Sequence, residues 1–469
     1  MTAGSRHFDV VVIGSGPAGQ EAAIQCAKRG RRVVVVERLR EIGGACVHQG
    51  TIPSKALRER ALERRAARGG LESGPVNIAE LIGEMGDVVH GHDRYMAAQL
   101  ERNGIAIVHG TAEFTSPHEV IVTHTDGHVE RLHAPNFVIA TGSKPRQPPN
   151  VRIDHENVYD SDSILSLAYL PLSLVVLGGG VIASEYASIF AVLGVKVTMI
   201  DRAPRPLGFV DEELVRHFVA AFDATGSEFV GEASVEAVES DGVSNIRTRL
   251  QSGRVIESEK VLCALGRESV IDGLHVDRAG VNVDDRHLVE VNAFGQTSAP
   301  HIYAAGDVIG PPSLASAAME QGRRAACHLL GVEPGRQGEW LPSGIYSVPE
   351  MACVGLSEHE VRRRYGDVWV GRASFGEIAR GHISGTPDGM LKLVASPDRI
   401  VRGIHIVGAL ATEMIHIGQM GLIHDATVDT YVENVFNFPT FAESYRVAAL
   451  QITGQVARPP LRVTTRAGD

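Results

Sequence analysis

Residues 10–19 read Val-Val-Val-Ile-Gly-Ser-Gly-Pro-Ala-Gly, an apolar, largely β-branched run that leads directly into a turn with three glycines. We expect a buried strand over 10–13 and a helix from the turn through about Lys28. After Arg32 the chain becomes apolar again over 33–36 and reaches an acid at Glu37. This order of strand, glycine turn, helix, strand and acid is typical of a unit that binds a dinucleotide.

Each residue type in this turn has a physical reason. Gly14 permits the tight turn, Gly16 lets a pyrophosphate approach the backbone, and Gly19 lets the helix pack closely on the strand. The N–H groups at the start of the helix can donate to the pyrophosphate. Glu37 can accept a hydrogen bond from a ribose hydroxyl, so the stretch predicts one complete nucleotide site.

A second copy of the motif occupies residues 174–183, which read Leu-Val-Val-Leu-Gly-Gly-Gly-Val-Ile-Ala. Gly178 and Gly180 take the first two glycine positions. A strand expected over 195–200 ends at Asp201, at the same spacing from the first glycine as the acid of the first copy. One glycine motif is weak evidence, but two in the same context indicate two dinucleotide sites. Chance glycine turns in an unrelated α/β protein are the alternative.

Composition narrows the class of protein. With 469 residues the chain is too long for one hydrophobic core, so two to four domains are expected. Its net charge of −11 argues against sequence-independent binding to nucleic acid or anionic membranes. The most apolar stretch, residues 174–200, is interrupted by Glu185 and Lys196, and residues 1–7 lack the features of an export signal. We therefore expect a cytoplasmic protein.

The five cysteines are scattered and odd in number, which indicates a reducing compartment rather than a disulfide framework. No His/Cys cluster has the spacing of metal ligands, so no metal is expected. His405 and His416 lie among apolar neighbours in the last third of the chain and are expected at a subunit interface.

Three further segments read as strands that end in turns of small residues, namely 137–143, 261–267 and 302–308. A helix is expected to start near Ser313 and to continue through about residue 325. Together with the two glycine motifs, these segments resemble the FAD-dependent pyridine nucleotide–disulfide oxidoreductases over essentially the whole chain.

The resemblance implies an α/β fold with two Rossmann-like dinucleotide-binding domains, as in glutathione reductase, and a C-terminal α+β dimerisation domain. It implies FAD at the first glycine motif, NAD(P) at the second, and a homodimer or larger homo-oligomer. The implied domains are a discontinuous FAD-binding domain over 1–150 and 272–340, an NAD(P)-binding domain over 151–271 and a dimerisation domain over 341–469.

The resemblance also assigns site residues. Lys55 and Glu185 match the family's catalytic pair beside the reactive edge of the flavin, where a cation stabilises the reduced cofactor. The cofactor-binding residues expected in this way are Gly14, Gly16, Gly19, Glu37, Gly44, Cys46, Thr51, Lys55, Thr141, Gly142, Gly178, Gly180, Asp201, Arg202, Arg205, Gly266, Arg267, Asp307 and Ala315.

The chain departs from the family at its redox disulfide. The family joins two cysteines five residues apart beside the flavin, and this chain has Cys46 but Thr51. A threonine hydroxyl forms neither a disulfide nor a stable thiolate. A lone cysteine in such a turn is more often an inert small side chain than a catalyst, and we assign no catalysis to His48.

A second departure lies near the C-terminus. The family places His-Pro-Thr-x-x-Glu there, and its histidine, reaching over from the partner subunit, protonates the leaving thiol. Here Phe438 replaces that histidine, while Glu443, which would orient it, remains. General acid catalysis is therefore lost at this position. Residues 458–469 also lack a cysteine pair, which argues against a mercuric reductase.

Together with these losses, the resemblance implies a flavoenzyme that transfers hydride between NADPH and NAD through flavin N5 in a ping-pong cycle, with NAD and NADP as its substrates. An NAD(P)H dehydrogenase, or diaphorase, that reduces quinones or other small acceptors is the alternative. A flavin-bound sensor without turnover and a disulfide reductase that pairs Cys46 with another thiol are further alternatives.

The second motif gives a mixed signal for nucleotide choice. Asp201 would bind the ribose diol of NAD and repel a 2′-phosphate. Arg202 and Arg205 follow directly and could bind that phosphate. A protein that uses both nucleotides is expected to carry both signals, whereas an NAD-only site with two solvated arginines is the alternative.

Overall fold

The structure is a computed structural model, and it describes residues 5–67, 78–243, 245–336 and 338–456. The tail 458–469, on which the argument about a cysteine pair rests, lies outside the described residues. The chain forms two compact units. The first comprises Met1–Gly178, Leu193–Val195 and Ala233–Arg336, and the second Gly179–Val192, Lys196–Glu232 and Gln337–Asp469.

The first unit is built on a parallel sheet in the order β19-β8-β2-β3-β4. Its strands are β2 Val10–Ile13, β3 Val33–Glu37, β4 Ala106–His109, β8 Asn136–Ile139 and β19 Ile302–Ala304. Every residue of β2 and β3 is buried, as expected of strands covered on both faces. The strands predicted over 10–13 and 32–37 are confirmed, and so are the strands predicted at the start of segments 137–143 and 302–308.

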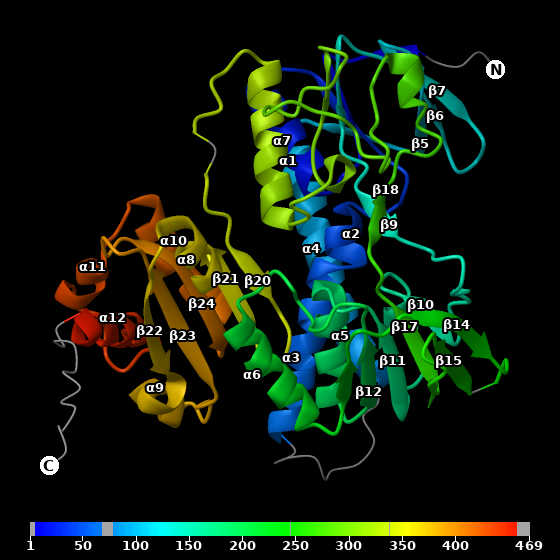
Figure 1. The fold of residues 1–469 in the computed structure, drawn as a ribbon. Helices are drawn as coiled ribbons and strands as arrows, with labels where there is room; N and C mark the ends of the chain where they lie inside the picture. The colour runs from blue at the N-terminus through cyan, green and yellow to red at the C-terminus, as the bar shows by residue number, and fades with distance from the viewer. Residues whose placement is uncertain (1–4, 68–77, 244, 337, 457–469) are drawn as a thin grey trace, which may run out of the picture. The chain divides into compact units, whose positions relative to one another are not determined.

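Helices α1 and α7 lie side by side in this unit (Figure 1). A Cβ atom at Gly322 of α7 would lie 2.1 Å from the carbonyl oxygen of Ala18 in α1, so only glycine permits this approach. The helices of the unit are α1 Pro17–Lys28, α2 Gly44–His48, α3 Thr51–Ala67, α4 Ile78–Arg102 and α7 Ala315–Leu329. The helices expected after the first motif and near Ser313 are confirmed.

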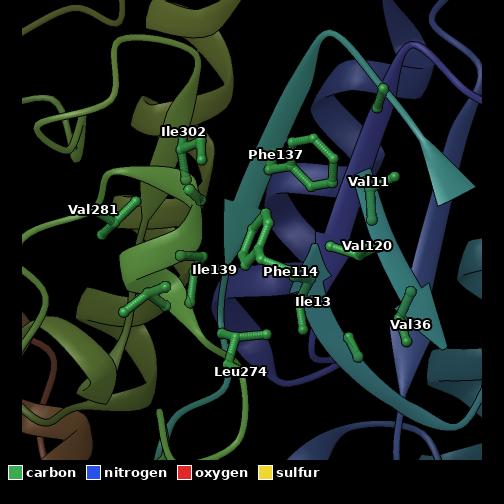
Figure 2. Packing of buried hydrophobic residues seen from close by; sticks show 14 of the residues in the cluster. Val11, Ile13, Val36, Phe114, Val120, Phe137, Ile139, Leu274, Val281 and Ile302 are labelled. Atoms are coloured by element: carbon green, nitrogen blue, oxygen red, sulfur yellow. The ribbon is translucent and has the colours of Figure 1, made fainter. Parts of the chain in front are cut away.

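A four-stranded sheet in the order β1-β7-β6-β5 packs against the parallel sheet. Its strands are β1 Ser5–His7, β5 Thr111–Ser116, β6 Glu119–Thr123 and β7 Val129–His133. Figure 2 shows the core between them, where the rings of Phe114 and Phe137 meet edge to face at 5.2 Å between centroids. Leu274 and Val281 belong to the same buried cluster, so a late segment of the chain completes this core.

The remaining strands of the first unit form three small groups. β10 Val158–Asp160, β17 Lys260–Cys263 and β11 Ser173–Leu177 are parallel neighbours in that order. β14 Val235–Ser240, β15 Ile246–Leu250 and β16 Val255–Ser258 form an antiparallel sheet, and β9 Ser143–Pro145 pairs with β18 Arg267–Ser269. The short 3₁₀ helices are Ile164–Ser166, Val276–Ala279 and Asp307–Ile309.

The second unit contains the helix and return strand of the second motif and an antiparallel sheet in the order β20-β21-β24-β23-β22. The elements of its first part are α5 Val181–Val192, β12 Lys196–Ile200, α6 Glu212–Asp223 and β13 Glu228–Val230. The sheet comprises β20 Ser343–Ile345, β21 Met351–Gly355, β22 Trp369–Ser374, β23 Gly389–Ala395 and β24 Val401–Gly408. Its helices are α8 Glu358–Tyr365, the 3₁₀ helix Phe375–Glu377, α9 Ala379–Ile383, α10 Ala411–Ile423, α11 Val428–Glu433 and α12 Glu443–Val456.

His405 lies inside the second unit rather than on its surface. It is in β24, is 3% exposed, and its Nε2 is 3.0 Å from the carbonyl oxygen of Leu356. The expectation that His405 is an interface residue is therefore wrong, because its apolar neighbours in sequence are neighbours in one sheet. His416 is exposed on α10. In the described part of the chain, no helix is long and apolar enough to span a membrane.

Candidate functional site: two glycine turns and a cysteine helix

Of the three glycines in the first turn, Gly14 and Gly19 lie against backbone atoms, and only Gly16 has open space beside it. Gly14 has φ +105°, and a Cβ there would lie 2.3 Å from the carbonyl oxygen of Ala140. A Cβ at Gly19 would lie 2.0 Å from the carbonyl oxygen of Gly14. At Gly16, by contrast, a Cβ would meet no described atom within 4 Å. Two glycines thus serve packing, and the third leaves room beside the N-terminus of α1.

Glu37 is fixed at the end of β3 by donors from the turn. The N–H and Oγ of Ser15 donate to its Oε2 at 2.9 and 2.7 Å, and the N–H of Leu39 donates to its Oε1 at 3.0 Å. A carboxylate offers about four acceptor positions, so capacity for a ribose hydroxyl remains. Ser15 Oγ also accepts from Gly43 N–H at 3.0 Å, which ties the turn to the segment before α2. Its position inside the motif was the signal that could have singled out Ser15.

The second glycine turn repeats this arrangement within the second unit. Gly179 N–H donates to Asp201 Oδ2 at 2.6 Å, and Ala203 N–H donates to Asp201 Oδ1 at 2.7 Å. These donors take the positions that Ser15 and Leu39 have around Glu37. The internal repeat is therefore present in hydrogen bonding as well as in sequence.

The arginines after Asp201 differ in their surroundings. Arg202 is exposed. Arg205 donates from its guanidinium to the carbonyl oxygens of Val210 and Gly208, both at 3.0 Å. Arg205 therefore stabilises the loop that contains it through these two hydrogen bonds, while the charged side chain of Arg202 faces solvent.

Cys46 and Thr51 lie in contact at the junction of α2 and α3. A Cβ at Gly44 would be 3.0 Å from Gly16 Cα, so the start of α2 packs against the first glycine turn. Burial raises the pKa of the Cys46 thiol, and a hydrogen bond with Thr51 and the charge of Lys55 oppose that rise only in part. The thiol is therefore protonated near neutral pH and is a poor nucleophile.

This environment predicts how Cys46 reacts. Because its pKa is raised, the thiolate fraction stays small at pH 7 and increases only above the ordinary pKa of a cysteine. We expect iodoacetamide to alkylate Cys46 slowly at pH 7 and much faster above about pH 9, as followed by mass spectrometry of the peptide. Fast alkylation at pH 7 would show an activated thiol instead.

Thr141 and its neighbours form the turn after β8. The Thr141 hydroxyl is buried, and none of the described residues hydrogen-bonds to it. Ser143 Oγ donates to Asp307 Oδ2 at 2.6 Å and accepts from Arg267 Nε at 2.9 Å. Arg267 also reaches Asp162 at 2.9 Å. Arg267 thus links segments within this unit, whereas the Thr141 hydroxyl has room for a hydrogen-bonding group that the described residues do not supply.

The other predicted residues of this region lie at turns and helix starts. Gly142 and Gly266 have φ +70° and +104°, and Ala315 is the first residue of α7. Gly178 has φ +118°, and a Cβ at Gly180 would meet no described atom within 4 Å. The second motif therefore has the same open position as the first.

Lys55 and Glu185 occupy different units. Lys55 Nζ donates to Ser54 Oγ at 3.3 Å within α3. Glu185 is 4% exposed in α5 and accepts from Tyr346 N–H at 2.8 Å. Each side chain has a hydrogen-bond partner inside its own unit, and their pairing stays a prediction.

Phe438 and Glu443, the residues at the family's histidine and glutamate positions near the C-terminus, lie in different surroundings. Phe438 is 67% exposed. Glu443 Oε2 is buried and has no hydrogen-bond partner among the described residues. Within the same part of the chain, no group of three or more His, Cys, Asp or Glu side chains could hold a metal ion.

Comparison with known proteins shows the family. The model of the pyridine nucleotide-disulphide oxidoreductases matches residues 8–322, and the model of their dimerisation domain matches residues 341–449. The chain belongs to this family, and the expected fold class is confirmed.

Within the family, the chain is similar to proteins named soluble pyridine nucleotide transhydrogenase. It is 41% identical to that of Vibrio atlanticus over 463 residues, which cover 95% of this chain and 98% of the relative. It is 40% identical to that of Mycobacterium tuberculosis over 460 residues, which cover 96% and 98%.

Two solved structures have the same fold at 26% identity. The HOCl-induced flavoprotein disulfide reductase RclA from Escherichia coli has a TM-score of 0.86 and covers 94% of this chain and 99% of its own. LpdA from Mycobacterium tuberculosis has a TM-score of 0.86 and covers 95% and 99%.

Proposed function

We propose that this protein transfers hydride between NADPH and NAD with FAD as its cofactor. The observation that carries the proposal is Thr51 in contact with Cys46 at the position where the family needs a second thiol. A hydroxyl there cannot complete a dithiol relay. Transhydrogenase relatives at about 40% identity over nearly the whole chain support the same function.

The residues around the first glycine turn fit FAD. The open position at Gly16, the α1 N-terminus and Glu37 would hold the pyrophosphate and a ribose, and the unpaired Thr141 hydroxyl would meet the cofactor. When bound, FAD supplies reversible hydride acceptance at N5, so that NADPH and NAD can use one nicotinamide site in alternation. The chain's part is to bind, orient and exclude water, because hydride transfer needs no acid or base.

The proposal includes the organisation of the chain. The FAD-binding domain would comprise 1–150 and 272–340, the NAD(P)-binding domain 151–271 and the dimerisation domain 341–469. The match to the family's dimerisation domain supports a homodimer. A cytoplasmic location belongs to the same proposal, because both nucleotides are found there.

The purified, FAD-loaded protein tests the function directly. We expect steady transfer of hydride from NADPH to a thio analogue of NAD, followed by absorbance, and no turnover with glutathione disulfide or lipoamide. Turnover with a quinone that far exceeds turnover with the NAD analogue would favour the diaphorase instead. Turnover with the disulfides would contradict the proposal.

The two arginines predict different effects on nucleotide choice. Arg202→Ala is expected to raise the KM for NADPH about tenfold and to leave that for NADH nearly unchanged, because a charged hydrogen bond to the 2′-phosphate is lost. Arg205→Ala is expected to raise both constants, since Arg205 holds the loop itself. If Arg202→Ala leaves the KM for both nucleotides unchanged, Arg202 is a solvated side chain and the alternative of an NAD-only site is favoured.

A further inference from the structure

Lys392 is a buried cation in the middle of the antiparallel sheet of the second unit. It lies in β23 and is 3% exposed. Its Nζ is 3.0 Å from both carboxylate oxygens of Asp211, 3.1 Å from Glu213 Oε2 and 3.0 Å from Glu358 Oε2. A desolvated ammonium is stable only with such partners, so removing it would leave three carboxylates without their common cation.

The row of side chains around Lys392 spans neighbouring strands. Arg372 in β22 and His405 in β24 are its register partners on the two sides. Arg372 donates to both oxygens of Glu213 at 2.7 and 2.9 Å. Two cations of the antiparallel sheet, Lys392 and Arg372, thus bind carboxylates at the N-terminus of α6. Asp211 caps this helix by accepting a hydrogen bond from Glu213 N–H.

Asp211 is also the last residue of the loop that begins at Asp201, the acid of the second glycine motif. Leu207, midway along this loop, is 1% exposed and has φ +50°, a conformation that costs a leucine free energy. Its N–H donates to the carbonyl oxygen of Gly179 at 2.7 Å, next to the donor that holds Asp201. A strained conformation persists only when the surrounding contacts hold it in place.

We infer that Lys392 is a positioning residue for the nucleotide-binding loop 201–211, although it is expected to touch no part of the nucleotide. It fixes Asp211 at the far end of the loop, while Gly179 fixes Asp201 at the near end and Leu207 midway along the loop. Arg205 spans the remaining part through Gly208 and Val210. This inference rests on the proposed function only in taking loop 201–211 as the reader of the nicotinamide nucleotide.

The test compares two buried lysines. Lys392→Met removes the cation beside the loop. Lys260→Met removes a lysine that is 5% exposed, lies in β17 and donates to the carbonyl oxygen of Glu156 and to Asn157 Oδ1, both at 2.8 Å. The FAD-loaded proteins are titrated with NADP⁺ and NAD⁺ in a calorimeter, and FAD content and Tm are recorded for each.

We expect Lys392→Met to raise the Kd of both nucleotides about tenfold at unchanged FAD content, because the loop loses one of its two anchors. With ferricyanide as acceptor, kcat at saturating NADPH should change less than the KM. Lys260→Met should lower Tm without changing either Kd, and Lys392→Arg should restore most of the affinity. These binding constants can be read even if NAD proves not to be the acceptor, so failure of the proposed function is distinguishable.

An unchanged Kd in Lys392→Met, or an equal rise in Lys260→Met, would overturn the inference and leave Lys392 as a purely structural ion. If Lys392→Met does not fold, Asp211→Asn decides the question, because it weakens the same anchor from the loop side while keeping the size of the side chain. A raised Kd supports the inference, and an unchanged Kd refutes it.

Discussion

Replacing Gly14 by alanine is expected to give a protein that contains almost no FAD and is strongly destabilised. The residue has φ +105°, and the new Cβ would lie 2.3 Å from the carbonyl oxygen of Ala140 in a neighbouring segment. Neither backbone segment can move without disturbing the hydrogen bonds between β2 and β8. Flavin absorbance per protein and thermal unfolding measure the two effects, and we expect a loss of at least about 2 kcal/mol in the free energy of unfolding.

Gly16→Ala is the matched control for this prediction. A Cβ there meets no described atom within 4 Å, so the apoprotein should unfold at nearly the wild-type temperature. The methyl group would nevertheless occupy the space assigned to the pyrophosphate, and the affinity for FAD should fall. Full FAD content in Gly16→Ala would show that the cofactor does not lie against this turn.

Lys55→Met is expected to lower the rate of hydride transfer by about 10²–10³-fold while leaving the FAD content close to wild type. The reason is electrostatic, because a fixed ammonium in a site shielded from water would stabilise the negative charge that the cofactor carries after reduction. The rate of flavin reduction by NADPH under anaerobic conditions measures this effect. Methionine has a similar length and no charge, so packing is largely kept.

Two variants separate charge from bulk in that experiment. Lys55→Arg keeps the charge and should retain more activity than Lys55→Met. Lys144→Met removes a half-buried lysine that is paired with Asp272 and should leave the rate unchanged. A wild-type rate in Lys55→Met would remove Lys55 from the catalytic pair.

The parts of the fold that are predictable from sequence are those with local periodic patterns. Runs such as 10–13 and 174–177 are apolar and β-branched and end in glycines, so the local pattern alone predicts both strands and both turns. The helix expected near Ser313 begins at Ala315, because Leu314 takes the extended conformation of a helix N-cap. The repeat of the two motifs is visible in the sequence because each dinucleotide site needs the same spacing between its first glycine and its acid.

The parts that are not predictable depend on contacts between distant segments. The contacts of Arg267 with Ser143 and Asp162 could not be foreseen, because these partners precede it by more than a hundred residues, and its role in binding a cofactor stays a prediction. No local pattern singles out Lys392, because only the register of the sheet and the positions of α6 and α8 bring its three carboxylates together. The prediction for His405 was wrong for the same reason, since an apolar neighbourhood in sequence does not distinguish a core from an interface.

The central claim is that this chain passes hydride from nucleotide to flavin to nucleotide without a dithiol step. The most direct measurement is a double-mixing stopped-flow experiment under anaerobic conditions, in which NADPH first bleaches the flavin absorbance and NAD is then added. We predict that NAD restores the oxidised flavin spectrum completely and that lipoamide or glutathione disulfide leaves it bleached. Restoration by a disulfide and not by NAD would contradict it.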